Sequence, residues 1–281
     1  GFGAVWGMAS AWIILVIIMF TVVKPIRNVG MRYNLKTIPD FAAVRYNEQS
    51  RTPAAISILL AYGYDCSYVA DSIARYPGML WGVGSVDFME DDGVEKIQYW
   101  MNERKLSGFR FFSHGSTHSE PAEIDDPRAF PVYDYLQEKQ IPLVMQIKKD
   151  GIRMLTNFMT KFPNLYLVID HAGQPKLEDG PPYEQLTPVL ELAKYPGIHL
   201  KITSSFLVRN ASKGKSTPQD FMRVIIDGYG ADRIMWGSNC PSFSDDLQEC
   251  VTIVKDACSD LSDKEREAFF SLNTQRFYSL G

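Results

Sequence analysis

The stretch GVEKIQYWMNERKLSGFRFF, residues 93–112, contains the pattern that decides the fold. Its first part, 93–105, places Ile97 and Met101 on one side of a helix, as an amphipathic helix requires. Its second part, 106–112, is a short apolar run with three phenylalanines, which favours a β-strand. Because strands that alternate with helices pair in parallel, this unit predicts an α/β fold.

The same unit recurs along the chain. Further apolar runs, each followed by a polar loop, lie at 54–60, 79–87, 141–147, 165–171, 197–203 and 232–238. No GxGxxG or GxxxxGK motif follows any of them, which disfavours an open nucleotide-binding sheet. We therefore predict a (β/α)8 TIM-type barrel whose first strand is degenerate or missing. In such barrels the chemistry lies at the carboxyl ends of the strands.

Composition sets limits on the class of protein. The 281 residues are 46% hydrophobic and 22% charged, which is typical of a globular chain with a full core. A net charge of -4 gives no basic surface for nucleic acid, so we expect no nucleic-acid partner. The four cysteines lack the spacing of a zinc site, and we expect free thiols in a reducing compartment, with the barrel domain in the cytoplasm.

The amino-terminal segment differs from the rest of the chain. Residues 4–23 contain no charged side chain and are followed by Lys24 and Arg27. This length and basic flank fit a membrane-spanning helix that would tether the barrel, whereas a buried strand of a parallel sheet is also continuously apolar. A misplaced start of the domain is the third alternative. We assign 1–33 to this apolar segment and 34–281 to the barrel domain.

The end of the run at 165–171 supplies the leading catalytic candidate. Period-two alternation places His171 on one face of the strand, with Leu167 and Ile169, and Asp170 on the other. A histidine that ends an apolar strand can act as a metal ligand, a proton shuttle or an oxyanion donor. We interpret Asp170 as a supporting or capping residue.

Polar side chains at the other strand ends are the candidates for binding a substrate. Arg110 lies on an apolar strand, so it needs either a protein carboxylate or an anionic substrate, and both alternatives stay open. We also predict substrate-binding roles for Gln146, Arg209 and Tyr64, and a catalytic role for Asn239.

Two further groups could take part in chemistry, but the sequence favours neither. His114 and His118 have the i, i+4 spacing of a metal pair, yet Gly115 indicates a loop rather than a helix. Cys240 follows Asn239, and the sequence supplies no base to activate it as a nucleophile.

Three segments carry a resemblance to a known family. They are FPNLYLVIDHAGQP (162–175), YPGIHLKITSSF (195–206) and YGADRIMWGSNCP (229–241). In this order they resemble the amidohydrolase-related family, and within it the lactone-hydrolase branch that includes L-fuconolactonase, sulfomuconolactone hydrolase and pyrone-dicarboxylate lactonase. The likeness extends over residues 54–281 and implies a (β/α)8 barrel.

The resemblance also implies roles for single residues. It makes His171 the histidine that ends strand six and Arg110 the arginine on strand four that faces the substrate. Asn239 takes the strand-eight position, where the family most often has Asp as the general base for water. Gln146 stands where metal-dependent members have a histidine.

Two departures from the family pattern affect the expected chemistry. The His-x-His pair that normally ends strand one is absent, because no histidine precedes Tyr33. One histidine with neutral Asn239 and Gln146 is a poor ligand set, so we predict no metal and no cofactor, with one divalent ion such as zinc as the alternative. The resemblance implies a hydrolase of a small carboxylated lactone or cyclic ester or amide. The alternative is a catalytically impaired protein that binds a small acid or a protein partner.

Overall fold

The computed structural model describes residues 64–113, 122–211, 213–239 and 247–280. The chain divides into two compact units, Gly1–Ala54 and Ala55–Gly281, and every described element belongs to the second. Among the described helices, none combines the length and the apolar character needed to cross a membrane. Several sequence predictions fall outside the described residues and stay predictions: those on 4–23, on the boundary at 33 and 34, on the run 54–60, and on His114, His118 and Cys240.

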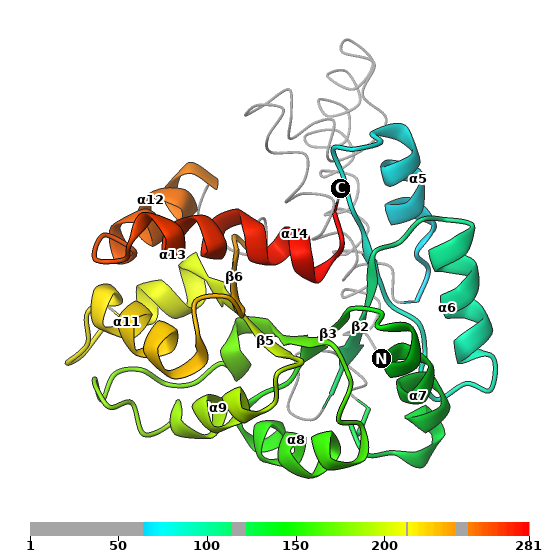
Figure 1. The fold of residues 1–281 in the computed structure, drawn as a ribbon, viewed down its shortest axis with the longest axis horizontal. Helices are drawn as coiled ribbons and strands as arrows, with labels where there is room; N and C mark the ends of the chain where they lie inside the picture. The colour runs from blue at the N-terminus through cyan, green and yellow to red at the C-terminus, as the bar shows by residue number, and fades with distance from the viewer. Residues whose placement is uncertain (1–63, 114–121, 212, 240–246, 281) are drawn as a thin grey trace, which may run out of the picture. The chain divides into compact units, whose positions relative to one another are not determined.

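In the described part of the chain, six strands form one parallel sheet that curls around an interior (Figure 1). Each strand pairs in parallel with the next one along the chain, and β1 and β6 are the two edges within the described residues. The strands are β1 Val83–Gly84, β2 Gly108–Phe112, β3 Leu143–Gln146, β4 Leu167–Ile169, β5 Ile198–Thr203 and β6 Ile234–Gly237. Each lies inside one of the predicted apolar runs, which confirms the parallel α/β prediction. Over the described residues, the curled sheet accounts for part of the predicted barrel.

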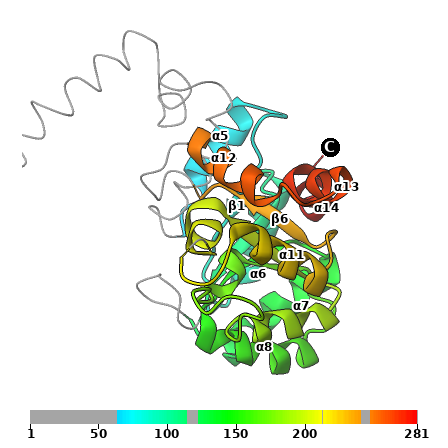
Figure 2. The ribbon, with the colours of Figure 1, turned by 90° about the vertical axis from the view of Figure 1, so that its left-hand side faces the viewer.

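Helices connect successive strands and lie on the outside of the curled sheet (Figure 1). The elements that follow β6 gather together at one end of this unit (Figure 2). The α-helices are α5 Ser67–Arg75, α6 Gly93–Asn102, α7 Phe130–Lys139, α8 Lys149–Lys161, α9 Thr187–Leu190, α10 Arg209–Ala211, α11 Pro218–Tyr229, α12 Leu247–Ala257, α13 Asp263–Glu267 and α14 Asn273–Phe277. Shorter helical turns are η4 Pro127–Ala129, η5 Asp170–Gly173, η6 Glu191–Lys194, η7 Ser204–Val208 and η8 Ala268–Leu272.

The two residues at the start of α11, the capping Thr217 and the first helical residue Pro218, show how a local sequence signal begins a helix. Thr217 has extended backbone angles, its Oγ1 accepts a hydrogen bond from the Asp220 amide at 3.0 Å, and Pro218 occupies the first helical position. We expect Thr217→Ala to lower the free energy of unfolding by about 1 kcal/mol, because one amide loses its cap. Urea unfolding measures this. Thr252→Ala, an exposed threonine inside α12, is the control, and equal losses in the two variants would contradict a capping role.

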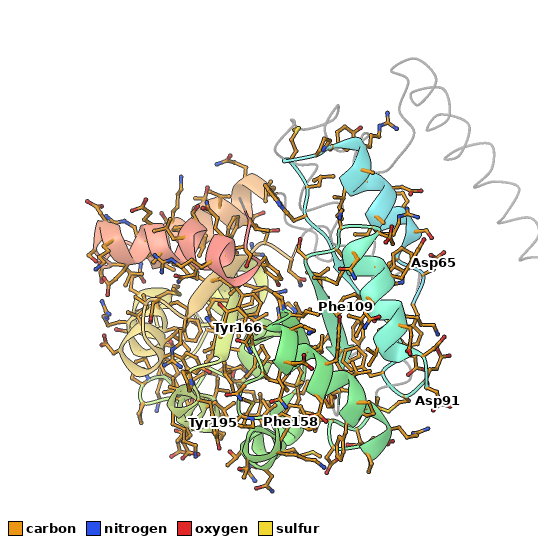
Figure 3. All side chains as sticks on the ribbon, turned by 45° about the vertical axis from the view of Figure 1, so that its right-hand side comes forward. Asp65, Asp91, Phe109, Phe158, Tyr166 and Tyr195 are labelled. Atoms are coloured by element: carbon orange, nitrogen blue, oxygen red, sulfur yellow. The ribbon has the colours of Figure 1, made fainter. Side chains whose placement is uncertain are left out.

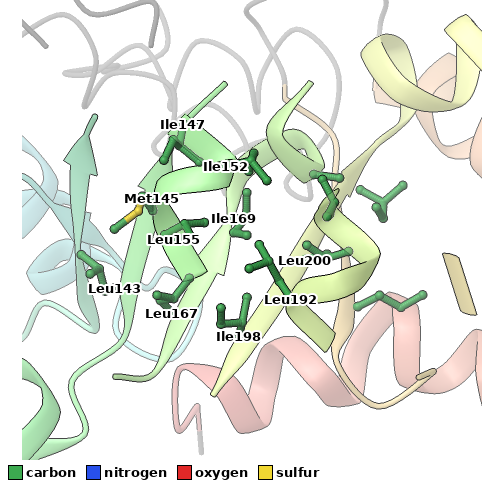
Figure 4. Close-up of a cluster of buried hydrophobic side chains, with 14 of the residues drawn as sticks. Leu143, Met145, Ile147, Ile152, Leu155, Leu167, Ile169, Leu192, Ile198 and Leu200 are labelled. Carbon is green, nitrogen blue, oxygen red and sulfur yellow. The ribbon is translucent and has the colours of Figure 1, made fainter. Parts of the chain in front are cut away.

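The outer face of the sheet forms the main hydrophobic core against the helices (Figure 4). Alternate strand residues such as Leu143, Leu167 and Ile198 point to this face and are fully buried. Leu155 of α8 and Leu192 of η6 belong to the same core. Because both faces of a parallel sheet are covered, its strands are continuously apolar, as the sequence runs are.

The inner face has an apolar end and a polar end. At the amino ends of the strands, Val144, Val168 and Met235 pack with Phe277 of α14. The Tyr166 ring stacks on Phe277 with 4.4 Å between the ring centroids. This packing, which includes the His199 ring, fills the amino-terminal side of the interior, whereas Asp170 follows β4 and lies toward the carboxyl ends of the strands.

Candidate active site

A buried carboxylate is the centre of the polar end. Asp170 follows β4, and its side chain has no exposed surface. One oxygen pairs with the Arg110 guanidinium from β2, and the other pairs with the Lys201 ammonium from β5. The strand register places Arg110 level with Val144 and Val168 on the inner face, and Lys201 level with Met235. Three strands therefore contribute one charged cluster to the interior, which we call the Asp170 cluster.

Arg110 makes two further contacts, with Gln146 and with the Phe112 ring. Its Nη2 donates a hydrogen bond to Gln146 Oε1 at 2.7 Å, and its guanidinium carbon lies 5.0 Å from the centroid of the Phe112 ring. Its Nε is buried and has no hydrogen-bond partner among the described residues. Of the two alternatives that the sequence left open, the structure shows a protein carboxylate, Asp170, as the partner of Arg110.

His171 lies just past the strand rather than on it. β4 ends at Ile169, and His171 has left-handed backbone angles, φ 54° and ψ 29°. Ala172, Gly173 and Gln174 also have positive φ, a conformation that is costly for residues other than glycine. The expected strand alternation therefore stops before His171. The turn brings the buried imidazole Nδ1 to 3.1 Å from Thr203 Oγ1, a hydroxyl on the inner face of β5.

The electrostatics of the site follow from burial and from the Asp170 cluster. Burial alone would raise the pKa of Asp170, but the charges of Arg110 and Lys201 outweigh it and hold this pKa well below its usual range. Burial lowers the pKa of Lys201 from its ordinary value, and Asp170 opposes this shift. Burial also lowers the pKa of His171 to about 4, and Asp170 opposes it, whereas Lys201 and Arg110 add to it. His171 is therefore neutral at pH 7, and it is a weaker base than an ordinary histidine.

β6 brings the last candidate to the same end of the sheet. Asn239 lies two residues past β6 and has a positive φ of 57°, which asparagine tolerates better than most side chains. The residue that ends β6, Gly237, lies against the Lys201 side chain, since a Cβ at Gly237 would come within 2.9 Å of Lys201 Cδ. The glycine thus leaves room for the lysine stem between β5 and β6.

Two of the predicted binding residues are not part of the Asp170 cluster. Arg209, at the start of α10, pairs with Glu249 of α12 at 2.7 Å, and both side chains are exposed. Tyr64 is 46% exposed and precedes α5. The structure thus brings Arg110, Gln146 and His171 together and leaves Arg209 and Tyr64 at the surface, where their binding roles stay predictions.

Lys201 and Asp170 have a larger part in the site than the sequence predicted, because both belong to the buried charged cluster. The sequence favoured a supporting or capping role for Asp170. Lys201 shares a strand face with His199, and the sequence left open whether it points into the barrel or between strand and helix, with a structural role favoured. The signal that could have found both is the same strand alternation: Val168 and His199 face the interior, so Asp170 and Lys201, two residues further on, face it too.

The described side chains do not fit a zinc site. A catalytic zinc needs about three protein ligands. Within the described residues no group of three His, Cys, Asp or Glu side chains is placed to hold a metal ion, and Asp170 is already engaged by two cations. That the protein needs no cofactor stays a prediction.

Comparison with known proteins shows the family. The sequence profile described as Amidohydrolase matches residues 27–280, so the chain belongs to the amidohydrolase family. A curated relative, L-fucono-1,5-lactonase from Burkholderia ambifaria, is 25% identical over 177 residues. The match covers 63% of this chain and 60% of the relative, so the chain spans about three fifths of that protein's length.

Solved structures support the barrel fold. A Burkholderia multivorans amidohydrolase with bound zinc matches with a TM-score of 0.64 and 21% identity, covering 76% of this chain and 78% of that one. A probable 2-pyrone-4,6-dicarboxylic acid hydrolase from Acinetobacter baumannii, with citric acid bound, matches with a TM-score of 0.62 and 15% identity, covering 77% and 79%. At these identities the likeness confirms the fold and nothing finer.

Proposed function

We propose that this protein hydrolyses a small carboxylated lactone, or a related cyclic ester or amide, by attack of water at the carboxyl-terminal mouth of the barrel. The observation that carries the proposal is the neutral, buried His171 at the end of β4, next to the Asp170 cluster. Family membership and the lactonase relative support the same reaction class.

The proposed steps use residues of this chain alone. His171 either takes a proton from the attacking water and returns it to the ring heteroatom as the acyl bond of the ring breaks, or it polarises the carbonyl and the proton passes through solvent. Thr203 fixes the orientation of the His171 ring. Asn239 orients the water, because an amide can donate and accept hydrogen bonds but cannot take a proton at neutral pH. Arg110, with Gln146 beside it, provides positive charge near the carbonyl, and Arg209 and Tyr64 bind the substrate from the rim.

A hydrolysis screen tests the proposal. Purified protein is incubated with a panel of small lactones with and without a carboxylate, and ring opening is followed by proton release. Turnover of a carboxylated lactone that is lost in His171→Ala supports the proposal. Turnover that survives this substitution removes His171 from the mechanism.

The pKa of His171 predicts a particular pH profile. Because the base must be neutral in the free enzyme, we expect kcat/KM to fall on the acid side with a midpoint at the pKa of His171, about 4. An ordinary histidine would give a midpoint near pH 6.5. Proton NMR titration of the imidazole, assigned through the signal that His171→Gln loses, measures the same pKa without substrate. A titration near pH 6.5 would contradict the predicted environment.

Asn239 favours a second candidate function. The position next to the mouth holds an amide where water activation would be served by a carboxylate, so the barrel can bind a small acid without converting it. Saturable binding of a carboxylated lactone without ring opening would select this function over the first.

A further inference from the structure

Among the described residues, the charges on the inner face do not balance. The Asp170 cluster contains two cations, Arg110 and Lys201, and one carboxylate. Asp170 is the one fully buried carboxylate among the described residues, and the neighbouring polar side chains Gln146 and His171 are neutral at pH 7. Other acidic residues of the described chain, such as Asp65 and Asp91, lie at its outer edge beside α5 and α6 (Figure 3). A cluster with one excess positive charge in a poorly solvated interior attracts an anion.

The open side of the cluster is at Lys201. The exposed fraction of the side chain is 0% for Asp170, 11% for Arg110 and 22% for Lys201. Arg110 is also engaged by Gln146 and by the Phe112 ring, whereas Asp170 is the ion-pair partner of Lys201 within the described residues. An ammonium has three donors, and one carboxylate oxygen cannot occupy them all.

The position of the ammonium is defined by packing. The Lys201 stem lies against Gly237, where even a single added methyl group would approach Cδ to 2.9 Å. Held between Gly237 and Asp170, the lysine has little freedom to turn away, so it does not lose much conformational entropy when it binds a ligand.

We propose that Lys201 binds the carboxylate of a monoanionic ligand on the inner face of the sheet, as the group that neutralises the Asp170 cluster. The inference rests on the proposed function in that it names the residue that receives the substrate's acid group. Thr203, the partner of His171, lies two residues further along β5, which corresponds to roughly 7 Å of strand. A substrate that reaches both residues has its carboxylate about that distance from the carbonyl that reacts.

Small probes test the binding site without turnover. Isothermal titration calorimetry with the full chain compares acetate with acetamide, its neutral analogue, at constant ionic strength. We expect saturable binding of acetate, no saturable binding of acetamide, and a loss of acetate affinity of about tenfold or more in Lys201→Met. Lys139→Met removes an exposed lysine that pairs with Glu138 on α7 and is the control that keeps the wild-type affinity.

A second measurement avoids dependence on one variant. In the wild-type protein, acetate should shift the imidazole NMR signals of His171, next to the cluster, and leave those of His199, which contacts Phe277 at the apolar end, unchanged. Unchanged acetate binding in Lys201→Met, equal binding of acetamide, or an absence of saturable acetate binding to the wild type would each overturn the inference. A protein that binds acetate at Lys201 but opens no lactone keeps this inference and loses the proposed reaction. A protein that opens neutral lactones but does not bind acetate keeps ring opening as its reaction and loses this inference.

Discussion

Replacing Asp170 by asparagine is expected to lower the free energy of unfolding by about 3 to 5 kcal/mol. The amide has nearly the shape of the carboxylate, so little packing is lost. The loss comes from Arg110 and Lys201, which would remain in the interior without a counter-charge. Urea unfolding followed by circular dichroism measures the change.

Two further variants separate the charge effect from other consequences of the substitution. Asp91→Asn makes the same chemical change at an exposed site and should alter stability by no more than about 0.5 kcal/mol. Lys201→Met leaves the Arg110–Asp170 pair intact, and the double variant with Asp170→Asn should be more stable than the sum of the two single losses by about 1 kcal/mol or more. Additive losses would show that Asp170 does not act through Lys201.

The sequence predicted the architecture because local patterns of apolar and polar residues specify the strands and helices. The runs at 106–112 and 141–147 are apolar on both faces, which is the property of a strand buried in a parallel sheet, and β2 and β3 lie inside them. The helix at 93–105 was predicted from its apolar side and is found as α6. Periodicity and turn residues are short-range signals, so they specify elements and their order.

The charged cluster could not be predicted in the same way, because its members are distant in sequence. Arg110, Asp170 and Lys201 meet only once β2, β4 and β5 lie side by side in a curved sheet. The position of His171 was also beyond the pattern, since alternation holds only while the backbone stays extended and β4 ends at Ile169. The left-handed turn that follows is set by tertiary packing, for example of Gly173 against Ile152, rather than by local preference.

If His171 polarises the carbonyl, so that no base serves the water in the wild-type protein, replacing Asn239 by aspartate is expected to raise kcat for lactone hydrolysis by about 10² to 10⁴-fold, the usual contribution of a general base. An aspartate at this position can take the proton from water that asparagine can only orient. The excess positive charge of the Asp170 cluster favours its ionised form, so the new carboxylate would be available as a base at neutral pH. The measurement is steady-state turnover of whichever carboxylated lactone the screen identifies.

The effect of Asn239→Asp depends on whether His171 is the base or the group that polarises the carbonyl. Introducing His171→Ala into the wild type and into Asn239→Asp distinguishes these two roles. If His171 is the base in the wild-type protein, its loss costs about 10² to 10⁴-fold there, but much less once aspartate at position 239 takes over the proton. If His171 polarises the carbonyl instead, its loss costs the same factor in both backgrounds, because the two groups then act on different atoms. Asn210→Asp, at a surface asparagine of α10 whose Oδ1 accepts from Lys213 Nζ, controls for the added charge. An unchanged kcat in Asn239→Asp would mean that position 239 does not touch the attacking water.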